Sequence, residues 1–211
     1  MNFLEFKASA MRADNKINNR IHFFSHYFSV YFAYLLYRLT FTPNQASFLF
    51  FLTGIASSYF LSIEYILVSY LLWRLHIILD MADGDIARAT ERFSELGHRI
   101  DMLAHSIINP MIIFFLIELV SNNTTLAIIS SFLSVIINNL KYFDKRKYEF
   151  DVQFRGNLYV ILLRECVSIE GFYIVAFLSF YFENIGNYAA TYIFLAILLQ
   201  LLYRAKKYFS N

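Results

Sequence analysis

The sequence predicts an all-α membrane protein, in which six transmembrane helices follow an N-terminal amphipathic helix in the membrane interface. Of its 211 residues, 58% are hydrophobic and 19% are aromatic, which is too apolar for a soluble domain of this size. The apolar stretches long enough to cross a bilayer lie at about residues 45–63, 65–83, 97–118, 124–141, 157–181 and 187–205. The sequence has no internal repeat, so we expect a single membrane domain over residues 1–211.

The segment before the first span, residues 1–43, is expected to be cytoplasmic and interfacial. Within residues 21–39, polar or small side chains form a narrow stripe at helical spacing against a broad face of Phe and Tyr. The stripe consists of His22, Ser25, His26, Ser29 and Ala33. This pattern is typical of a helix that lies along the membrane surface. Thr42-Pro43-Asn44 then favours the start of the first span, since Pro suits the first turn of a helix.

Lysine and arginine are concentrated in alternate joints between the predicted spans. They gather in the N-terminal segment, in the joints at 84–96 and 141–156, and in the cytoplasmic tail at 206–211. The joints that hold none are the one near Glu64 and those at 119–123 and 182–187. Because positive charge marks the cytoplasmic side, we expect both termini in the cytoplasm, with a six-helix bundle over residues 44–205. The formal net charge of +2 argues against a general nucleic-acid-binding surface, so we expect no nucleic-acid partner.

Acidic residues interrupt the apolar chain in the stretch DMADGDIARATERFSELGHRIDMLAH, residues 80–105. One helix face carries residues at i, i+3, i+4 and i+7 spacing, namely Asp80, Asp83, Gly84 and Ala87. Asp85 points away from that face. A second stripe, on the next helix, repeats every four residues and consists of Gly97, Asp101 and His105.

Two helices that meet along these faces bring three carboxylates and an imidazole together around two glycines, which allow a backbone or a ligand to come close. Clustered carboxylates repel one another unless a cation lies among them, and oxygen ligands favour Mg²⁺, Mn²⁺ or Ca²⁺. The alternative interpretation is a set of solvated charges in a loop between two spans. Ionisable groups at membrane depth are costly and usually functional, which favours the metal site.

The stretch resembles the CDP-alcohol phosphotransferase family, also called the CDP-alcohol phosphatidyltransferase family, which carries the motif D-x2-D-G-x2-A-R-x8-G-x3-D-x3-D. The residues that match it in type and spacing are Asp80, Asp83, Gly84, Ala87, Arg88, Gly97 and Asp101. The sequence departs at the last position, where His105 replaces an aspartate. The resemblance implies Mg²⁺ or Mn²⁺ at Asp80, Asp83 and Asp101. It places His105 where the family has the base that deprotonates the acceptor hydroxyl.

The resemblance further implies that the CDP donor is bound by Asp80, Gly84, Ala87, Arg88 and Gly97. The implied activity is that of a divalent-metal-dependent membrane transferase in phospholipid, lipid or glycan biosynthesis. Such an enzyme moves a phospho-alcohol group, for example phosphatidyl, from a CDP-alcohol to an acceptor hydroxyl and releases CMP. Family members are commonly homodimers whose six-helix cavity opens to the cytosolic leaflet, so we expect a homodimer with its active site facing the cytoplasm.

Three arginines and a histidine have alternative interpretations. Arg155 and Arg164 are candidates for an anionic acceptor pocket, or else serve as a cytoplasmic anchor and an ion-pair partner. Arg88 either contacts the donor phosphates through its planar guanidinium or is an ordinary anchor. His76 lies one turn before Asp80 and is either its partner or a core histidine.

Two other classes of function fit parts of the pattern. An ion-coupled transporter predicts acidic residues spread along several spans, whereas here they gather at the ends of two adjacent helices. A catalytically inactive family member that serves as a partner subunit accounts for His105, but it does not account for the otherwise intact motif.

Overall fold

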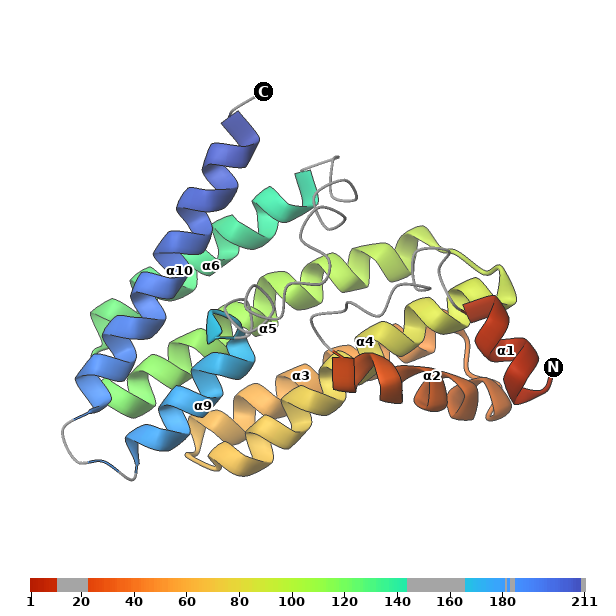
Figure 1. Ribbon diagram of the computed structural model, residues 1–211, viewed down its shortest axis with the longest axis horizontal. Coiled ribbons are helices and arrows are strands. Elements are labelled where there is room, and N and C mark those ends of the chain that lie inside the picture. Colours follow the sequence, from red (N-terminus) through yellow and green to blue (C-terminus); the bar gives the residue numbers. More distant parts are fainter. Residues whose placement is uncertain (11–22, 144–165, 181, 183–184, 210–211) are drawn as a thin grey trace. The chain divides into compact units, whose positions relative to one another are not determined.

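The computed structural model describes residues 1–10, 23–143, 166–180, 182 and 185–209 (Figure 1). These residues form eight α-helices and contain no strand. The helices are α1 (Phe3–Ala10), α2 (Phe23–Arg38), α3 (Pro43–Ser62), α4 (Ile66–Thr90), α5 (Glu95–Ser121), α6 (Thr124–Phe143), α9 (Ile169–Ser179) and α10 (Gly186–Phe209). The predicted all-α class is therefore confirmed over the described residues.

Helices α3, α4, α5, α6 and α10 each cover one of the predicted spans. Three helical stretches, Pro43–Ser62, Glu95–Ser121 and Gly186–Lys206, are long and apolar enough to cross a membrane. Helix α4 is not among them, and it carries Arg74, Asp80 and Asp83 within its predicted span. The composition of three helices thus supports a membrane protein, while the full set of six spans stays a prediction.

The predicted helix over residues 157–181 is wrong as one continuous element. Residues 157–165 lie outside the described part of the chain, but the break comes after them, where Val167 and Ser168 form a turn before α9. Ser168 has an extended backbone (φ −88°, ψ 170°), and its hydroxyl accepts a hydrogen bond from the Gly171 N–H. Serine competes for backbone hydrogen bonds in this way and so favours a helix start over a helix interior.

Four of the helices end at a non-glycine residue with a positive φ angle. These residues are Thr40 (63°), Glu64 (67°), Glu91 (55°) and Asn122 (50°). After Glu91, the Arg92 N–H donates to the Ala87 carbonyl oxygen at 3.0 Å, which is the closing bond of a Schellman motif. Helix α4 therefore continues to Thr90, two turns into the predicted joint at 84–96, and only a short loop separates it from α5.

The chain divides into two compact units, and α3, α4 and α5 each contribute residues to both. The first unit comprises Met1–Ser57 and Tyr70–Ala104. In this unit α1 lies against α2 (Figure 1), and Phe6 of α1 is fully buried. Its ring centroid lies 5.5 Å from that of Tyr34. The sequence did not predict α1, because residues 1–20 are mixed and polar.

Helix α2 closely matches the predicted helix at 21–39, but part of its stripe faces the protein. Ser29 and Ala33 are fully buried, whereas Phe28 and Leu35 are 47% and 55% exposed. The reason is that Ser29 donates a hydrogen bond to the buried Asp85 of α4. Phe28 and Leu35 therefore lie on the outer side of α2, and the position of the helix in the membrane interface stays a prediction.

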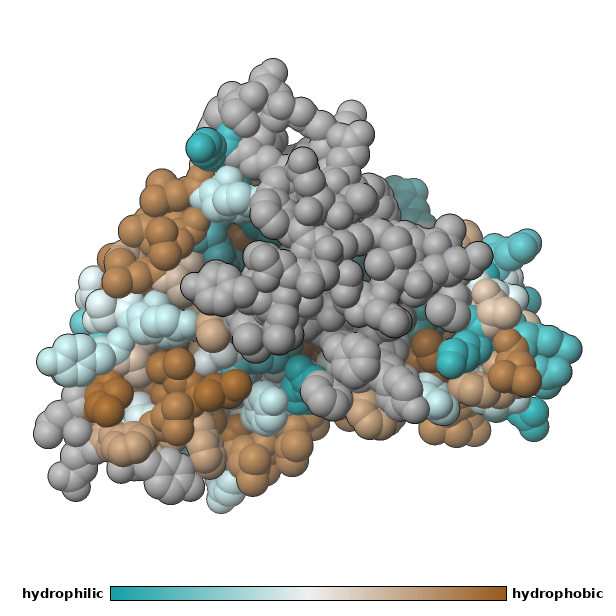
Figure 2. Space-filling view, in the orientation of Figure 1, coloured by the Kyte–Doolittle hydropathy of each residue, from teal (hydrophilic) through white to brown (hydrophobic). Residues whose placement is uncertain are grey.

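The second unit comprises Ser58–Ser69 and His105–Asn211. Here α10 packs against α6 and α9 (Figure 1). At the start of α10, a Cβ atom on Gly186 would lie 1.9 Å from the Val120 carbonyl oxygen, so only glycine fits this contact. Leu195, Leu199 and Leu202 are exposed at i, i+4 and i+7 on α10, and Figure 2 shows brown, hydrophobic side chains at the surface. An apolar outer face of this kind suits a lipid environment.

Candidate metal centre and donor site

Helix α4 carries the acidic residues of the motif on one continuous helix, because it runs past them to Thr90. Asp80 and Asp83 are half-buried on it. Asp83 has a partner from α3, since the Ser47 hydroxyl donates to its Oδ2 at 2.5 Å. Like-charge repulsion acts on Asp83 from both Asp80 and Asp101. These three carboxylates of the first unit are thus close enough to interact, as the spacing predicted.

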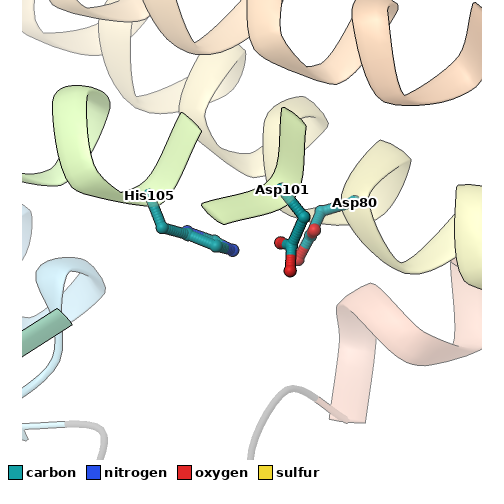
Figure 3. Close-up of side chains that lie close together, drawn as sticks. All are labelled: Asp80, Asp101 and His105. Atoms are coloured by element: carbon teal, nitrogen blue, oxygen red, sulfur yellow. The ribbon is translucent and has the colours of Figure 1, made fainter. Parts of the chain in front are cut away.

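Asp101 lies near the start of α5, and His105 follows it one turn later on the same helix. One ligand atom from each of Asp80, Asp101 and His105 lies within 4.8 Å of the other two. Figure 3 shows the carboxyl groups of Asp80 and Asp101 side by side, with the His105 ring directed toward them. The His105 main chain is held as well, because Asn138 donates to its carbonyl oxygen at 2.8 Å. The structure thus brings the two predicted stripes together at these residues.

The donor set fits a divalent cation. Carboxylate oxygens are the ligands that Mg²⁺ and Mn²⁺ prefer, and an imidazole nitrogen is better suited to Mn²⁺ than to Mg²⁺. Two ligands of one Mg²⁺ ion lie at most about 4.2 Å apart, since each bond is about 2.1 Å long. The ligand atoms of Asp80, Asp101 and His105 lie within 4.8 Å of one another, so they must move closer together to share one ion.

Gly97, at the start of α5, is in close contact with the start of α3. Its N–H donates to the Ser94 hydroxyl oxygen at 2.9 Å, and the Ser94 hydroxyl donates to Asn44 Oδ1 at 2.5 Å. A Cβ atom on Gly97 would lie only 3.1 Å from that same Asn44 oxygen. Ser94 therefore occupies the N-cap position of α5, and the absence of a side chain at Gly97 allows Asn44 to approach.

Gly84 has a different neighbour. A Cβ atom there would lie 3.1 Å from Nη1 of Arg88, so the guanidinium covers this glycine. Arg88 Nη2 donates to Asp85 Oδ1 at 2.5 Å, and Arg88 Nε donates to the Ala10 carbonyl oxygen at 2.8 Å. Asp85 does leave the face shared by Asp80 and Asp83, but it does not reach solvent: it is 1% exposed.

The other residues singled out in the sequence are His76, Ala87, Arg155 and Arg164. His76 is fully buried, its Nδ1 is 2.8 Å from the Phe50 carbonyl oxygen, and its ring stacks on Trp73. These contacts favour a core histidine over a partner of Asp80. Ala87 lies on α4 as predicted and is half-buried. Arg155 and Arg164 lie outside the described residues.

Sequence reasoning missed the hydroxyl groups that support the site. Ser29, Ser47 and Ser94 each make a hydrogen bond to a polar residue at least 36 positions away in the sequence. Serines are common in membrane helices, and only the observed partners distinguish these three. The signal that was present for Ser94 is its position three residues before Gly97 at the start of an apolar run.

A cavity of about 400 Å³ lies elsewhere, in the second unit. It is lined by residues at the end of α5 and around the start of α10, among them Ser121, Asn122 and Asn187. None of the motif residues lines it, so the candidate site is the acidic group and not this cavity.

The family described as CDP-alcohol phosphatidyltransferase matches residues 40–205. The chain is also similar to a protein of Archaeoglobus fulgidus named "Bifunctional IPC transferase and DIPP synthase", with 30% identity over 119 residues. That alignment covers 56% of this chain and 24% of the Archaeoglobus protein, so the chain spans about a quarter of that relative.

Proposed function

Because the chain belongs to the CDP-alcohol phosphatidyltransferase family, we propose that it moves a phospho-alcohol group from a CDP-alcohol to an acceptor hydroxyl and releases CMP. The family match covers residues 40–205, which include the whole motif, and it confirms the resemblance seen in the sequence. Its activity as a phosphotransferase, its donor, its acceptor, its metal and the roles of its residues are all parts of this proposal.

The observation that best supports the proposal is the convergence of Asp80, Asp101 and His105 from α4 and α5. Transfer between a diphosphate and a hydroxyl needs compensation of negative charge and a base for one proton. A cluster of carboxylates beside an imidazole provides groups for both tasks. Neither a covalent intermediate nor a nucleophilic side chain is required.

The proposed metal residues are Asp80, Asp83 and Asp101. When bound there, Mg²⁺ or Mn²⁺ neutralises charge on the donor diphosphate as CMP leaves. Ser47 holds the Asp83 carboxylate in place through its hydrogen bond, which fixes the orientation of one ligand. Gly84, Ala87, Arg88 and Gly97 are proposed to bind the CDP part of the donor together with Asp80.

His105 is proposed to accept the proton of the acceptor hydroxyl at one of its imidazole nitrogens. The acceptor oxygen then forms a bond to the phosphorus that carries the alcohol group. The bond from that phosphorus to the oxygen of CMP breaks, and CMP leaves with the electron pair. Atoms and charge balance without a further reactant, since the proton lost by the acceptor resides on His105 until solvent removes it.

The membrane arrangement completes the proposal. The alternation of Lys and Arg supports cytoplasmic termini and an active site on the cytoplasmic side. Homodimer formation is proposed from the family alone. The acceptor belongs to lipid or lipid-linked glycan synthesis, and the substrates of the Archaeoglobus relative belong in any panel that is tested.

The test is CMP release from a panel of CDP-alcohols by the purified protein, with Mg²⁺, with Mn²⁺ and after EDTA. We expect release with one donor class, loss of release with EDTA, and recovery with added metal. Asp80→Asn and Asp101→Asn should each remove most of the activity while the variants keep the wild-type melting temperature. Absence of CMP release from every donor in the panel, by folded protein with metal, would refute the proposed function.

A further inference from the structure

The guanidinium of Arg88 is fixed from two sides within the first unit. Asp85 Oδ1 accepts from Nη2 at 2.5 Å, and the Ala10 carbonyl oxygen accepts from Nε at 2.8 Å. Ala10 is in the last turn of α1, where carbonyl groups lack a partner within their own helix. The first helix of the chain therefore supplies an acceptor to the motif arginine. Arg88 itself remains partly accessible, with a side chain that is 19% exposed.

Asp85 is the buried member of this pair, and both of its oxygens are bonded. Oδ1 binds Arg88, and Oδ2 accepts from the Ser29 hydroxyl of α2 at 3.0 Å. Burial of a carboxylate is costly unless it is paired and hydrogen-bonded, and here both conditions are met. Ser29 and Asp85 therefore hold Arg88 through a chain of hydrogen bonds that runs from α2 to α4.

Two of the three guanidinium nitrogens of Arg88, Nε and Nη2, donate hydrogen bonds to the acceptors described above. The third nitrogen, Nη1, lies next to Gly84. Nη1 has no acceptor among the residues that the structure describes, and it lies over Gly84, 3.1 Å from where a Cβ atom would be. Gly84 is one turn after Asp80, on the face of the proposed metal residues. The free donor of Arg88 is thus next to the place where the proposed function puts the diphosphate.

We propose that Asp85 is a positioning residue for donor binding, which holds Arg88 over Gly84 so that Nη1 can donate to a phosphate oxygen of a nucleoside diphosphate. The proposal rests on the proposed function for the identity of that ligand. Asp85 points away from the face of Asp80 and Asp83, so this role comes from its contact with Arg88. Asp85 acts through Arg88 and touches no reacting atom.

The test is a double-mutant cycle on nucleotide binding by the full chain in the presence of Mn²⁺. Affinity for CDP and for cytidine is measured for the wild type, Asp85→Asn, Arg88→Ala and the double variant. Asp85→Asn should weaken CDP binding about tenfold and leave cytidine binding unchanged, because only CDP carries phosphates. In the Arg88→Ala background, Asp85→Asn should weaken CDP binding no further. Glu91→Gln, which removes an exposed carboxylate from the turn after α4, is the matched control and should bind CDP normally.

Equal loss of CDP and cytidine binding in Asp85→Asn would show a general structural role and overturn the proposal. A full further loss in the Arg88→Ala background would do the same. Should Asp85→Asn fail to fold, Ser29→Ala replaces it in the same cycle, since it removes the hydroxyl that donates the 3.0 Å bond to Asp85. Ser29→Ala should weaken CDP binding about twofold to fivefold, and this effect should vanish in the Arg88→Ala background. If the effect is the same in both backgrounds, Ser29 and Arg88 are not coupled and the proposal is overturned.

This result can be separated from a failure of the proposed function. Wild-type protein that binds neither CDP nor any CDP-alcohol contradicts the proposed function itself. Wild-type protein that binds CDP, together with no coupling between Asp85 and Arg88, contradicts only the positioning role.

Discussion

Replacement of His105 separates the two roles that its position allows. The imidazole lies within 4.8 Å of the ligand atoms of Asp80 and Asp101, so it is close enough to serve as base or as metal ligand. One nitrogen cannot do both, because a nitrogen bound to a metal has no lone pair for a proton. His105→Ala should leave the local fold intact, since Asn138 bonds the main-chain carbonyl oxygen, which alanine also has.

If His105 is the base, His105→Ala should lower kcat about 10²–10⁴-fold, which corresponds to about 2.7–5.4 kcal/mol of transition-state stabilisation. The Mn²⁺ concentration for half-maximal activity should then stay near the wild-type value. If His105 is a ligand, the Mn²⁺ requirement should rise at least about 10–100-fold, the range for loss of even an outer-shell partner. His105→Asp, which restores the residue of the family motif, should recover part of the rate.

The assay is CMP release at saturating donor and acceptor over a range of Mn²⁺ concentrations. A large fall in kcat at unchanged Mn²⁺ requirement supports the base. A rate that recovers at high Mn²⁺ supports the ligand instead. A His105→Ala enzyme with a near-normal rate and an unchanged Mn²⁺ requirement would refute both roles and would leave His105 as a packing residue.

Three further predictions concern other parts of the chain. Ser47→Ala removes a hydrogen bond to the Asp83 carboxylate, worth about 1.5–3 kcal/mol, so the Mn²⁺ concentration for half-maximal activity should rise about tenfold or more. Ser62→Ala, at the other end of α3, is the control, and an equal rise in both variants would contradict the role of Ser47. Gly186→Ala places a Cβ atom 1.9 Å from the Val120 carbonyl oxygen, so α10 must shift. The melting temperature should fall by several degrees, which corresponds to a loss of about 1–3 kcal/mol in the free energy of unfolding, and an unchanged melting temperature would contradict the close contact. In a Cys166→Ser background, Asn122→Cys should be labelled from outside the cell and Glu91→Cys only after permeabilisation, and the reverse pattern would contradict the cytoplasmic site.

The sequence predicted the helices of the bundle best where apolar runs end at clear signals. Thr42 is an example: its main-chain N–H donates to Gln45 Oε1 at 2.8 Å, a capping box that Pro43 already favoured. The C-terminal ends were harder to predict, because Thr40, Glu64 and Glu91 adopt positive φ angles without being glycine. The break at Ser168 was missed because its flanking residues are apolar on both sides.

The sequence predicted those parts of the candidate site that depend only on which face of a helix a residue occupies. Spacing alone placed Asp80, Asp83 and Asp101 on faces that meet, and the structure brings these side chains within interaction range. Periodicity gave the direction of Asp85 as well, but it could not reveal Ser29 as a partner 56 positions earlier. Contacts of that range depend on how helices pack, and local sequence carries little information about them.

The position of Ser94 limits where residues can be added to or removed from the chain. As the N-cap of α5 it fixes where the helix begins, and therefore the rotational phase at which Asp101 and His105 emerge. One residue added between Ser94 and Asp101 would turn both side chains by about 100° around the helix axis, away from Asp80. Insertions and deletions in functional relatives should therefore be absent between this serine and His105, which agrees with the fixed spacing of the family motif.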